Sequence, residues 1–424
     1  MNTLLKKFGI YFCCIFILLF FLFPSFVQAE DSEISTYSPA CLLMEASTGK
    51  VIYEKNAHTR MYPASTTKIM TAILVLENGN LTDTVTVSEN AVLSIPNGYS
   101  TAQLQIGEQF TVEQLLYALM LPSANDAAVA LAEYIAGSVD SFAAMMNTKA
   151  VEIGCQDTHF VNPNGVHDEN HYSTTYDLAL MGQYAMENST FRSIVSTAQF
   201  SLPATNQHPT ADRTFHNTNS LLSSSLSSNG YNYYYYPYCT GIKTGYTDSA
   251  KSCIVASAKK DDLEFIVVVL GGETLESGLS GRYLDCKTLF DYGFNNYSFH
   301  TILEKSSVVD QIEIMNGTEE TRNLGLIAEN NLTVFAKNDV DFESLTPTIS
   351  ITNTSAPISK SSVVGTISYT VEGETFSTNL LAASNVEVSR VMENVLKVVI
   401  AIFLIFLAIL ILTPKKEKTK KKRK

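Results

Sequence analysis

Cysteine is sparse in this chain and lacks the spacing of a structural framework. Two of the seven cysteines lie within the first 29 residues, and the other five are scattered, with no C-x-x-C pair. This pattern excludes a disulfide framework and a cysteine-ligated zinc site as organising features. We expect buried free thiols at the five remaining positions, which are Cys41, Cys155, Cys239, Cys253 and Cys286.

Basic residues are scarce in the central part of the sequence. The formal net charge of −13 over 424 residues includes +2 from Lys6 and Lys7 and +7 from residues 415–424, so residues 30–414 carry −22. A body this acidic offers no general footprint for a phosphate backbone. We therefore expect no nucleic-acid partner, and any bound anion must be held by a few local positive charges.

A long apolar run lies near the N-terminus. Two lysines precede the run from Phe8 to Phe23, and Pro24 and the small-residue ending Val27-Gln28-Ala29 follow it. This order predicts a cleavable secretory signal over residues 1–29, with the mature chain beginning near Glu30. An uncleaved membrane anchor is the alternative.

A second apolar run, Val398 to Leu412, lies near the C-terminus and is followed by eight basic residues. With the apolar residues before it, the run approaches the length that spans a bilayer, and the basic tail fits the positive-inside rule. We predict a single transmembrane helix over 391–413, a cytoplasmic tail over 414–424 and an extracytoplasmic body at the cell membrane. A helix lying on the membrane surface is the alternative, but the run has no polar face.

Between these ends, hydrophobic periodicity predicts an α+β domain over residues 30–296. A hairpin is predicted at residues 41–53, and β-rich runs return at 254–256 and 265–270. Strands at both ends with helices between them favour an antiparallel sheet packed against helices. Helical spacing is found at about residues 69–78, 111–120, 126–135, 139–151, 174–186 and 277–292.

Residues 297–388 have a different pattern, with short apolar runs and frequent turn-forming residues. Short β-rich runs alternate with Asn, Gly, Ser and Pro, and Glu372-Gly373 is a candidate hairpin turn. This pattern predicts a small all-β domain, whose simplest role is a spacer between the body and the membrane. The predicted strands cover residues 308–314, 332–336, 349–352, 363–371 and 375–381.

Residues 223–238 form a Ser-rich and then Tyr-rich tract. Such a tract predicts a long loop. A surface loop that packs on its own domain is favoured over an aromatic wall above a binding site.

A serine and a lysine three positions apart share one face of a helix. This spacing occurs at Ser47 and Lys50 in a predicted turn, at Ser257 and Lys260 at a strand end, and at Ser65 and Lys68. The third pair begins a strongly periodic helix. There the helix dipole favours an alkoxide at the serine, and the lysine amine can accept its proton. A simple N-cap role for Ser65 is the alternative.

Two further short motifs offer polar groups. Lys243-Thr244-Gly245 occurs once and provides an ammonium, a hydroxyl and an unhindered backbone, which suit a carboxylate on an extended substrate. Ser123-Ala124-Asn125 lies between two predicted helices and provides a hydroxyl and an amide. The second pattern recurs elsewhere in the chain and is weak by itself.

The order Ser-x-x-Lys, Ser-x-Asn, Lys-Thr-Gly is that of class A β-lactamases and penicillin-binding proteins. Over about residues 35–381, the chain resembles the low-molecular-mass penicillin-binding proteins, specifically the serine D-alanyl-D-alanine carboxypeptidases. The Ser/Tyr tract before Lys243 is longer than this family leads us to expect. The matching segments are PASTTKIMT at 63–71, PSANDA at 122–127, FVNPNG at 160–165 and GIKTGYT at 241–247.

The resemblance implies a penicillin-binding protein/β-lactamase-like fold and removal of the terminal D-alanine from peptidoglycan stem pentapeptides through an acyl-enzyme. It also implies covalent inhibition by β-lactam antibiotics, with no cofactor and no metal. Ser65 would be the nucleophile, Lys68 the base, and Ser123 the group that passes a proton to the leaving amine. For Lys68 to be a base, burial and a nearby charge must lower its pKa.

The resemblance further implies the substrate-binding groups. The backbone N–H groups of Ser65 and Tyr246 would form an oxyanion hole. The substrate-binding residues would be Asn125, Lys243, Thr244, Gly245 and Tyr246.

Other functions stay open at this stage. His167 and His171 have the interval of a helical zinc site, but they lie in a predicted loop without the Glu of H-E-x-x-H. A β-lactamase needs a general base for deacylation, for which Glu169 is the only nearby candidate. A transpeptidase is argued against mildly, since no large N-terminal domain is evident. A non-catalytic peptidoglycan-binding protein has no use for all six polar motif residues.

Overall fold

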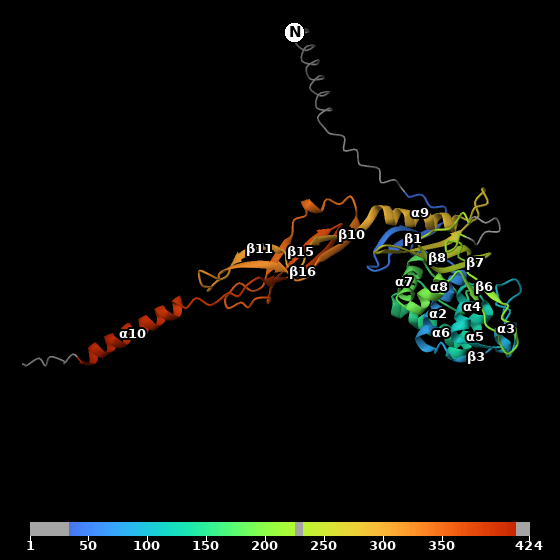
Figure 1. Cartoon of the computed structure of the whole chain (residues 1–424), viewed down its shortest axis with the longest axis horizontal. Helices are drawn as coiled ribbons and strands as arrows, with labels where there is room; N and C mark the ends of the chain where they lie inside the picture. Colours follow the sequence, from blue (N-terminus) through green and yellow to red (C-terminus); the bar gives the residue numbers. More distant parts are fainter. Residues whose placement is uncertain (1–33, 225–231, 413–424) are drawn as a thin grey trace, which may run out of the picture. The chain divides into compact units, whose positions relative to one another are not determined.

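The structure is a computed structural model that describes residues 34–224 and 232–412. It divides into two compact units (Figure 1). The first contains residues 34–44, Val51–Ala258 and Phe265–Phe290, and the second contains Glu45–Lys50, Lys259–Glu264 and residues 291–412. The predicted signal sequence at 1–29 and the basic tail at 414–424 lie outside the described residues.

A five-stranded sheet forms the centre of the first unit. Its strand order is β2-β1-β9-β8-β7, so strands from the two ends of this part of the sequence lie together. The predicted hairpin is confirmed as the antiparallel pair β1 and β2, and β7 pairs antiparallel with β8, which leaves β7 at the edge. The strands are β1 (Ala40–Glu45), β2 (Val51–Lys55), β7 (Cys239–Thr247), β8 (Lys251–Lys260) and β9 (Leu263–Gly272).

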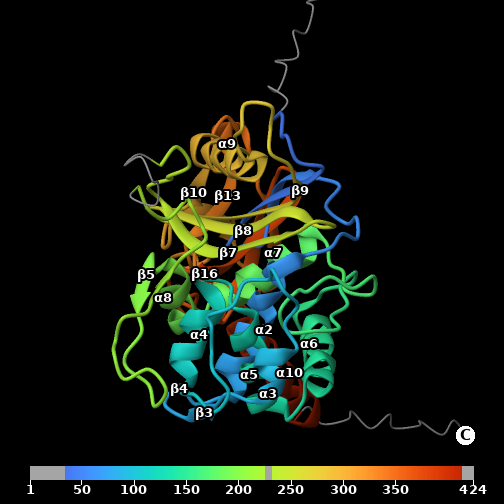
Figure 2. The same cartoon turned by 90° about the vertical axis from the view of Figure 1, so that its right-hand side faces the viewer.

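Helices cover both faces of this sheet. Figures 1 and 2 show α9 on one side and the group that includes α2, α4, α5 and α6 on the other. Within this group α2 is central, since every residue from Lys68 to Val75 is buried. The helices are η1 (Ala64–Thr67), α2 (Lys68–Asn78), α3 (Glu89–Leu93), α4 (Val112–Met120), α5 (Asn125–Ala136), α6 (Val139–Ile153), α7 (Thr175–Met186), α8 (Ser189–Ser196) and α9 (Gly281–Asn296).

The longer helices lie close to their predicted positions, with one clear shift. The helix predicted at 277–292 begins at Gly281 instead, because Gly278 adopts a left-handed φ of 79° and its N–H donates to the Leu275 carbonyl in a turn. Six short elements of the first unit were not predicted, because periodicity needs a longer window. These are α3, α8, β3 (Thr84–Thr86), β4 (Gln109–Thr111), β5 (Gln199–Ser201) and β6 (Thr214–His216).

The second unit contains the predicted small β domain. A two-stranded sheet pairs β10 with β13, and a five-stranded sheet has the order β11-β12-β16-β15-β14. The Glu372-Gly373 turn is confirmed, since both residues have positive φ and Val371 pairs with Glu374. Its strands are β10 (Tyr297–Leu303), β11 (Val308–Glu313), β12 (Asn323–Ala328), β13 (Leu332–Lys337), β14 (Thr348–Ile351), β15 (Val363–Val371) and β16 (Glu374–Ala382).

Helix α10 (Val391–Leu412) follows this domain and contains a shorter apolar stretch, Asn394–Ile409. By length and hydropathy, none of the individual helices in the described part of the chain qualifies as a membrane span.

The described part of the Tyr-rich tract packs on its own domain. Tyr236 is buried and stacks on Phe290 of α9 with ring centroids 5.4 Å apart. The Tyr234 hydroxyl accepts a hydrogen bond from the Ser280 N–H at 2.8 Å. These contacts agree with a loop that packs on the body, as predicted for the tract.

The five described cysteines carry free thiols, as predicted, and all except the half-buried Cys239 are buried. Burial raises the pKa of Cys41, Cys155 and Cys239 to about 12, so none of these three is a reactive thiolate near neutral pH.

Candidate active site

A cavity of about 470 Å³ runs beside the edge strand β7 and brings the three sequence motifs together. Ser65, Ser123, Asn125 and Thr244 all contribute to its wall. Residues that the motifs did not indicate complete the lining. They are Asn97, Gly98, Tyr99, Ser100, Thr218, Thr247, Asp248 and Arg282.

Ser65 lies inside the 3-10 turn η1, which runs directly into α2. It is half-buried, and neither helical segment uses it as an N-cap, since Pro63 and Thr67 occupy those positions. The N-cap alternative for this serine is therefore wrong. The hydroxyl lies at the positive end of the helix dipole, as its sequence position predicts.

Lys68 is completely buried and contacts three oxygen atoms. Its Nζ lies 3.0 Å from Ser65 Oγ, 2.7 Å from Asn125 Oδ1 and 2.6 Å from the Asn164 carbonyl oxygen. Burial, and then the charge of Lys243, lowers the pKa of Lys68 well below its ordinary value, while Asp126 opposes this.

These contacts define where the lone pair of a neutral Lys68 points. An unprotonated amine has two N–H donors and one lone pair. The Asn164 carbonyl can only accept, and Asn125 presents its oxygen because its amide nitrogen donates to the Ser100 carbonyl at 2.9 Å. Both donors are thereby used, and the lone pair faces the Ser65 hydroxyl.

Two glycines let the backbone close around Ser65. A Cβ at Gly245 would lie 2.9 Å from the Ser65 nitrogen, so only glycine allows β7 to pass this close. The approach at Gly165, which has a φ of 80°, is closer still, since a Cβ there would lie 1.9 Å from the Ala64 carbonyl oxygen. Ala64 itself has a φ of 49°, which is strained backbone next to the proposed nucleophile.

The Ser123-Ala124-Asn125 motif connects α4 to α5. Ser123 is buried with a left-handed φ of 64°, and its Oγ has no hydrogen-bond partner among residues 34–224 and 232–412. Ser123 is also one of the residues that line the cavity. Asn125, at the start of α5, links the Ser100 carbonyl to Lys68.

Four consecutive residues of strand β7, Thr244 to Thr247, line the cavity. Thr244 lines the cavity, and its Oγ1 lies 2.6 Å from Thr218 Oγ1, while Tyr246 is 60% exposed. Lys243 is only 1% exposed and donates to the Thr244 carbonyl at 3.0 Å. Burial, and then the nearby Arg282, lowers the pKa of Lys243 to about 7.

Arg282 of α9 is a cavity residue that sequence reasoning missed. Its guanidinium donates to the Gly245 and Cys253 carbonyls at 3.0 and 3.2 Å. An isolated arginine in a predicted helix carries no sequence signal. The carbonyl of Asn164 was missed for a related reason, because a backbone acceptor has no residue signature, although its segment FVNPNG was singled out.

His171, one of the two histidines with zinc-site spacing, makes hydrogen bonds through both ring nitrogens. His171 is buried, its Nε2 lies 2.8 Å from Thr67 Oγ1, and its Nδ1 accepts from the Val161 N–H at 3.2 Å. The donor groups of the described residues include no cluster of three or more His, Cys, Asp or Glu that could hold a metal ion. Both ring nitrogens of His171 are occupied, so the zinc-peptidase hypothesis loses a ligand.

The other two Ser-x-x-Lys pairs lack helical geometry, as predicted. Ser47 bonds to the carboxylate of Glu45 in the turn between β1 and β2, and Ser257 lies within β8.

Comparison with known proteins identifies relatives of both parts of the chain. A family model described as D-alanyl-D-alanine carboxypeptidase matches residues 27–274, and one described as penicillin-binding protein 5, C-terminal domain, matches residues 297–388. D-alanyl-D-alanine carboxypeptidase DacF of Bacillus subtilis is 32% identical over 372 residues, covering 85% of this chain and 89% of the relative. A D-alanyl-D-alanine carboxypeptidase of a Streptomyces species is 38% identical over 263 residues, covering 59% of this chain and 85% of the relative.

Solved structures agree with these sequence matches. Penicillin-binding protein 5 of Haemophilus influenzae aligns with a TM-score of 0.63 at 27% identity, over 83% of this chain and 98% of the other. The Streptomyces K15 DD-transpeptidase aligns with a TM-score of 0.54 at 36% identity, over 62% of this chain and 98% of the other.

Proposed function

This chain belongs to the D-alanyl-D-alanine carboxypeptidase family of serine hydrolases, and from this premise we propose that Ser65, Lys68 and Ser123 carry out the reaction. The observation that supports this assignment best is the buried Lys68 amine, whose Nζ lies 3.0 Å from Ser65 Oγ. The substrate is a peptidoglycan stem peptide that ends in D-alanyl-D-alanine.

In the first step, Ser65 Oγ attacks the carbonyl carbon of the penultimate D-alanine while Lys68 takes the hydroxyl proton. Burial and the charge of Lys243 lower the pKa of Lys68, which favours the unprotonated amine that a base requires. The bond to the terminal D-alanine then breaks. The leaving amine takes a proton that Ser123 relays, and an ester on Ser65 remains until water hydrolyses it.

We assign substrate binding to the cavity wall along β7. An extended peptide adds to the free edge of this strand, with its carbonyl oxygen between the N–H groups of Ser65 and Tyr246. Asn125 and the close approach at Gly245 fix the reacting segment. Lys243 and Thr244 bind the terminal carboxylate, and Arg282, which lines the cavity with Thr244, adds positive charge there.

Labelling with fluorescent penicillin tests the nucleophile. The wild-type protein should form a lasting covalent adduct, Ser65→Ala should form none, and the control Ser47→Ala, in the turn after β1, should label normally. Label that survives Ser65→Ala would refute the assignment. Penicillin that is hydrolysed within seconds, with no lasting adduct, would instead support a β-lactamase.

We also propose how the chain is divided and located. Residues 30–296 form the catalytic domain and 297–388 the β domain, residues 1–29 are a cleaved signal, and 391–413 cross the membrane once before a cytoplasmic tail at 414–424. The apolar run and the eight basic residues after it support this arrangement. N-terminal sequencing should find a start near Glu30, and carbonate at high pH should leave the protein in the membrane fraction. Release by carbonate would overturn the membrane span.

A further inference from the structure

The cavity segment, residues 97–104, of which 97–100 line the cavity, is held from the start of α5 by two consecutive residues. Asn125 contacts the Ser100 carbonyl with its backbone N–H and with its side-chain amide, both at 2.9 Å. Asp126 accepts from the N–H groups of Ala102 at 3.0 and 3.1 Å and of Leu104 at 3.1 Å. The mechanism proposed above uses Asn125 but gives no part to Asp126.

We propose that Asp126 is a positioning residue of the catalytic centre, whose carboxylate fixes the cavity segment and, through Ser100 and Asn125, the amine of Lys68. The inference rests on the proposed role of Lys68. The side chain is 2% exposed and lies in the first turn of α5. Burial raises the pKa of Asp126, and the helix dipole and the backbone N–H donors around the carboxylate oppose this. A third hydrogen bond comes from the N–H of Ala127 at 2.9 Å.

Asp126 also acts on Lys68 by its charge. The charged and titratable groups around the amine are Asp126 from α5, Lys243 from β7 and, through Thr67, the neutral His171. Lys243 favours the neutral amine and Asp126 favours the protonated one. The carboxylate therefore limits how far the pKa of Lys68 falls, in addition to holding the segment.

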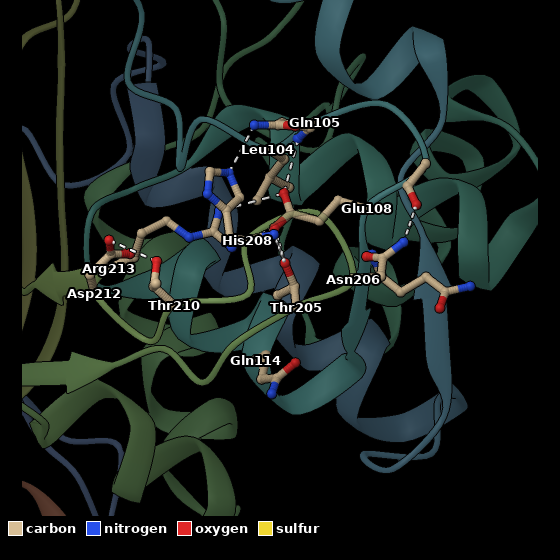
Figure 3. A network of polar contacts seen from close by, with 12 residues as sticks. Leu104, Gln105, Glu108, Gln114, Thr205, Asn206, His208, Thr210, Asp212 and Arg213 are labelled. Atoms are coloured by element: carbon tan, nitrogen blue, oxygen red, sulfur yellow. Dashed lines mark hydrogen bonds and ion pairs between the residues drawn. The ribbon is translucent and has the colours of Figure 1, made fainter.

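A second buried carboxylate, Glu108, provides a matched comparison at the far end of the same loop (Figure 3). Its side chain accepts from Thr205 Oγ1 and Arg213 Nη2, both at 2.5 Å, and from the Gln105 N–H at 3.1 Å. The Gln105 amide in turn contacts His208. Glu108 thus fixes this loop to the 205–213 segment, but it is not among the charges that act on Lys68.

The test compares Asp126→Asn with Glu108→Gln. The second-order rate constant for acylation by fluorescent penicillin is measured against pH, after thermal unfolding has shown that each variant is folded. In Asp126→Asn the plateau rate should fall about tenfold, because the Lys68 amine is misplaced. The acidic limb of its pH–rate profile should move to lower pH by about one unit, because the Asp126 charge that favours the protonated form of Lys68 has been lost. Glu108→Gln loosens the loop, but the acidic limb of its pH–rate profile should stay at the wild-type pH, because Glu108 is not among the charges that act on Lys68.

The outcomes separate this inference from the proposed function. A limb that stays at the wild-type pH in Asp126→Asn, or that moves equally in Glu108→Gln, overturns the positioning role. If Asp126→Asn does not fold, the smaller and equally uncharged Asp126→Ser takes its place with the same expected shift. A wild-type protein that takes no label at Ser65 overturns the proposed function, and this inference with it.

Discussion

The approach of Gly165 to Ala64 leads to a prediction in which stability and activity change by different amounts. An alanine Cβ at position 165 would lie 1.9 Å from the Ala64 carbonyl oxygen, whereas real Cβ contacts do not fall below 3.0 Å. Relief of the clash requires a movement of at least about 1.1 Å. Ala64 is joined directly to Ser65, so the movement displaces the nucleophile from Lys68. A displacement of about 1 Å at reacting groups typically lowers the rate about 100-fold.

The same substitution also places a Cβ on backbone with a φ of 80°, which costs about 1 to 2 kcal/mol by itself. Gly137→Ala separates the two effects, because Gly137 has a φ of 77° but no atom within 4 Å of the added Cβ. Both variants should lose stability in urea unfolding, and only Gly165→Ala should lose about 100-fold in the rate of acylation by penicillin. If Gly165→Ala is acylated within threefold of the Gly137→Ala rate, the close approach does not position Ser65 and the reasoning is wrong.

Three further outcomes follow from the site. Ser123→Ala should slow acylation by about 100-fold or more, yet leave the free energy of unfolding unchanged or higher in urea titrations, because the hydroxyl has no partner among the described residues. Burial lowers the pKa of His171 from 6.5 to about 3, so below pH 6.5 only the unfolded chain takes up the proton. Stability should therefore fall by several kcal/mol between pH 6.5 and 3, and His171→Gln should flatten this loss when unfolding is measured at pH 7 and pH 4. In steady-state assays of peptide cleavage, Arg282→Met should raise KM about tenfold or more for a peptide with a free terminal carboxylate. The rise should be much smaller for the same peptide with an amidated C-terminus. An equal rise for both peptides would contradict carboxylate binding by Arg282.

The sequence was sufficient to predict the parts of the site that depend on local structure. Ser65 and Lys68 are adjacent because of helical spacing, and only this one of the three Ser-x-x-Lys pairs has a helix to act through. The hairpin at Glu372-Gly373 was predictable for the same reason, since turn residues act locally.

The rest of the site depends on tertiary packing that local patterns do not encode. Arg282 reaches the cavity from α9, and the acceptor at Asn164 is a backbone carbonyl. Lys243 was expected to contact the substrate carboxylate directly. Its side chain is buried and its charge lowers the pKa of Lys68, while its contact with the carboxylate stays a prediction.

The low pKa of Lys68 follows from the groups that are packed around its amine. An ammonium buried without a directly paired carboxylate is costly, and two of the three oxygens that contact Lys68 belong to uncharged amide groups while the third is the serine hydroxyl. Asp126, the carboxylate that acts on Lys68 among the described residues, is already engaged by three backbone N–H groups and opposes the low pKa only partly. Because the surroundings supply no direct counter-charge, they favour the free amine over the ammonium. That form has its lone pair directed at Ser65, so the packing that buries the lysine also prepares it as the base.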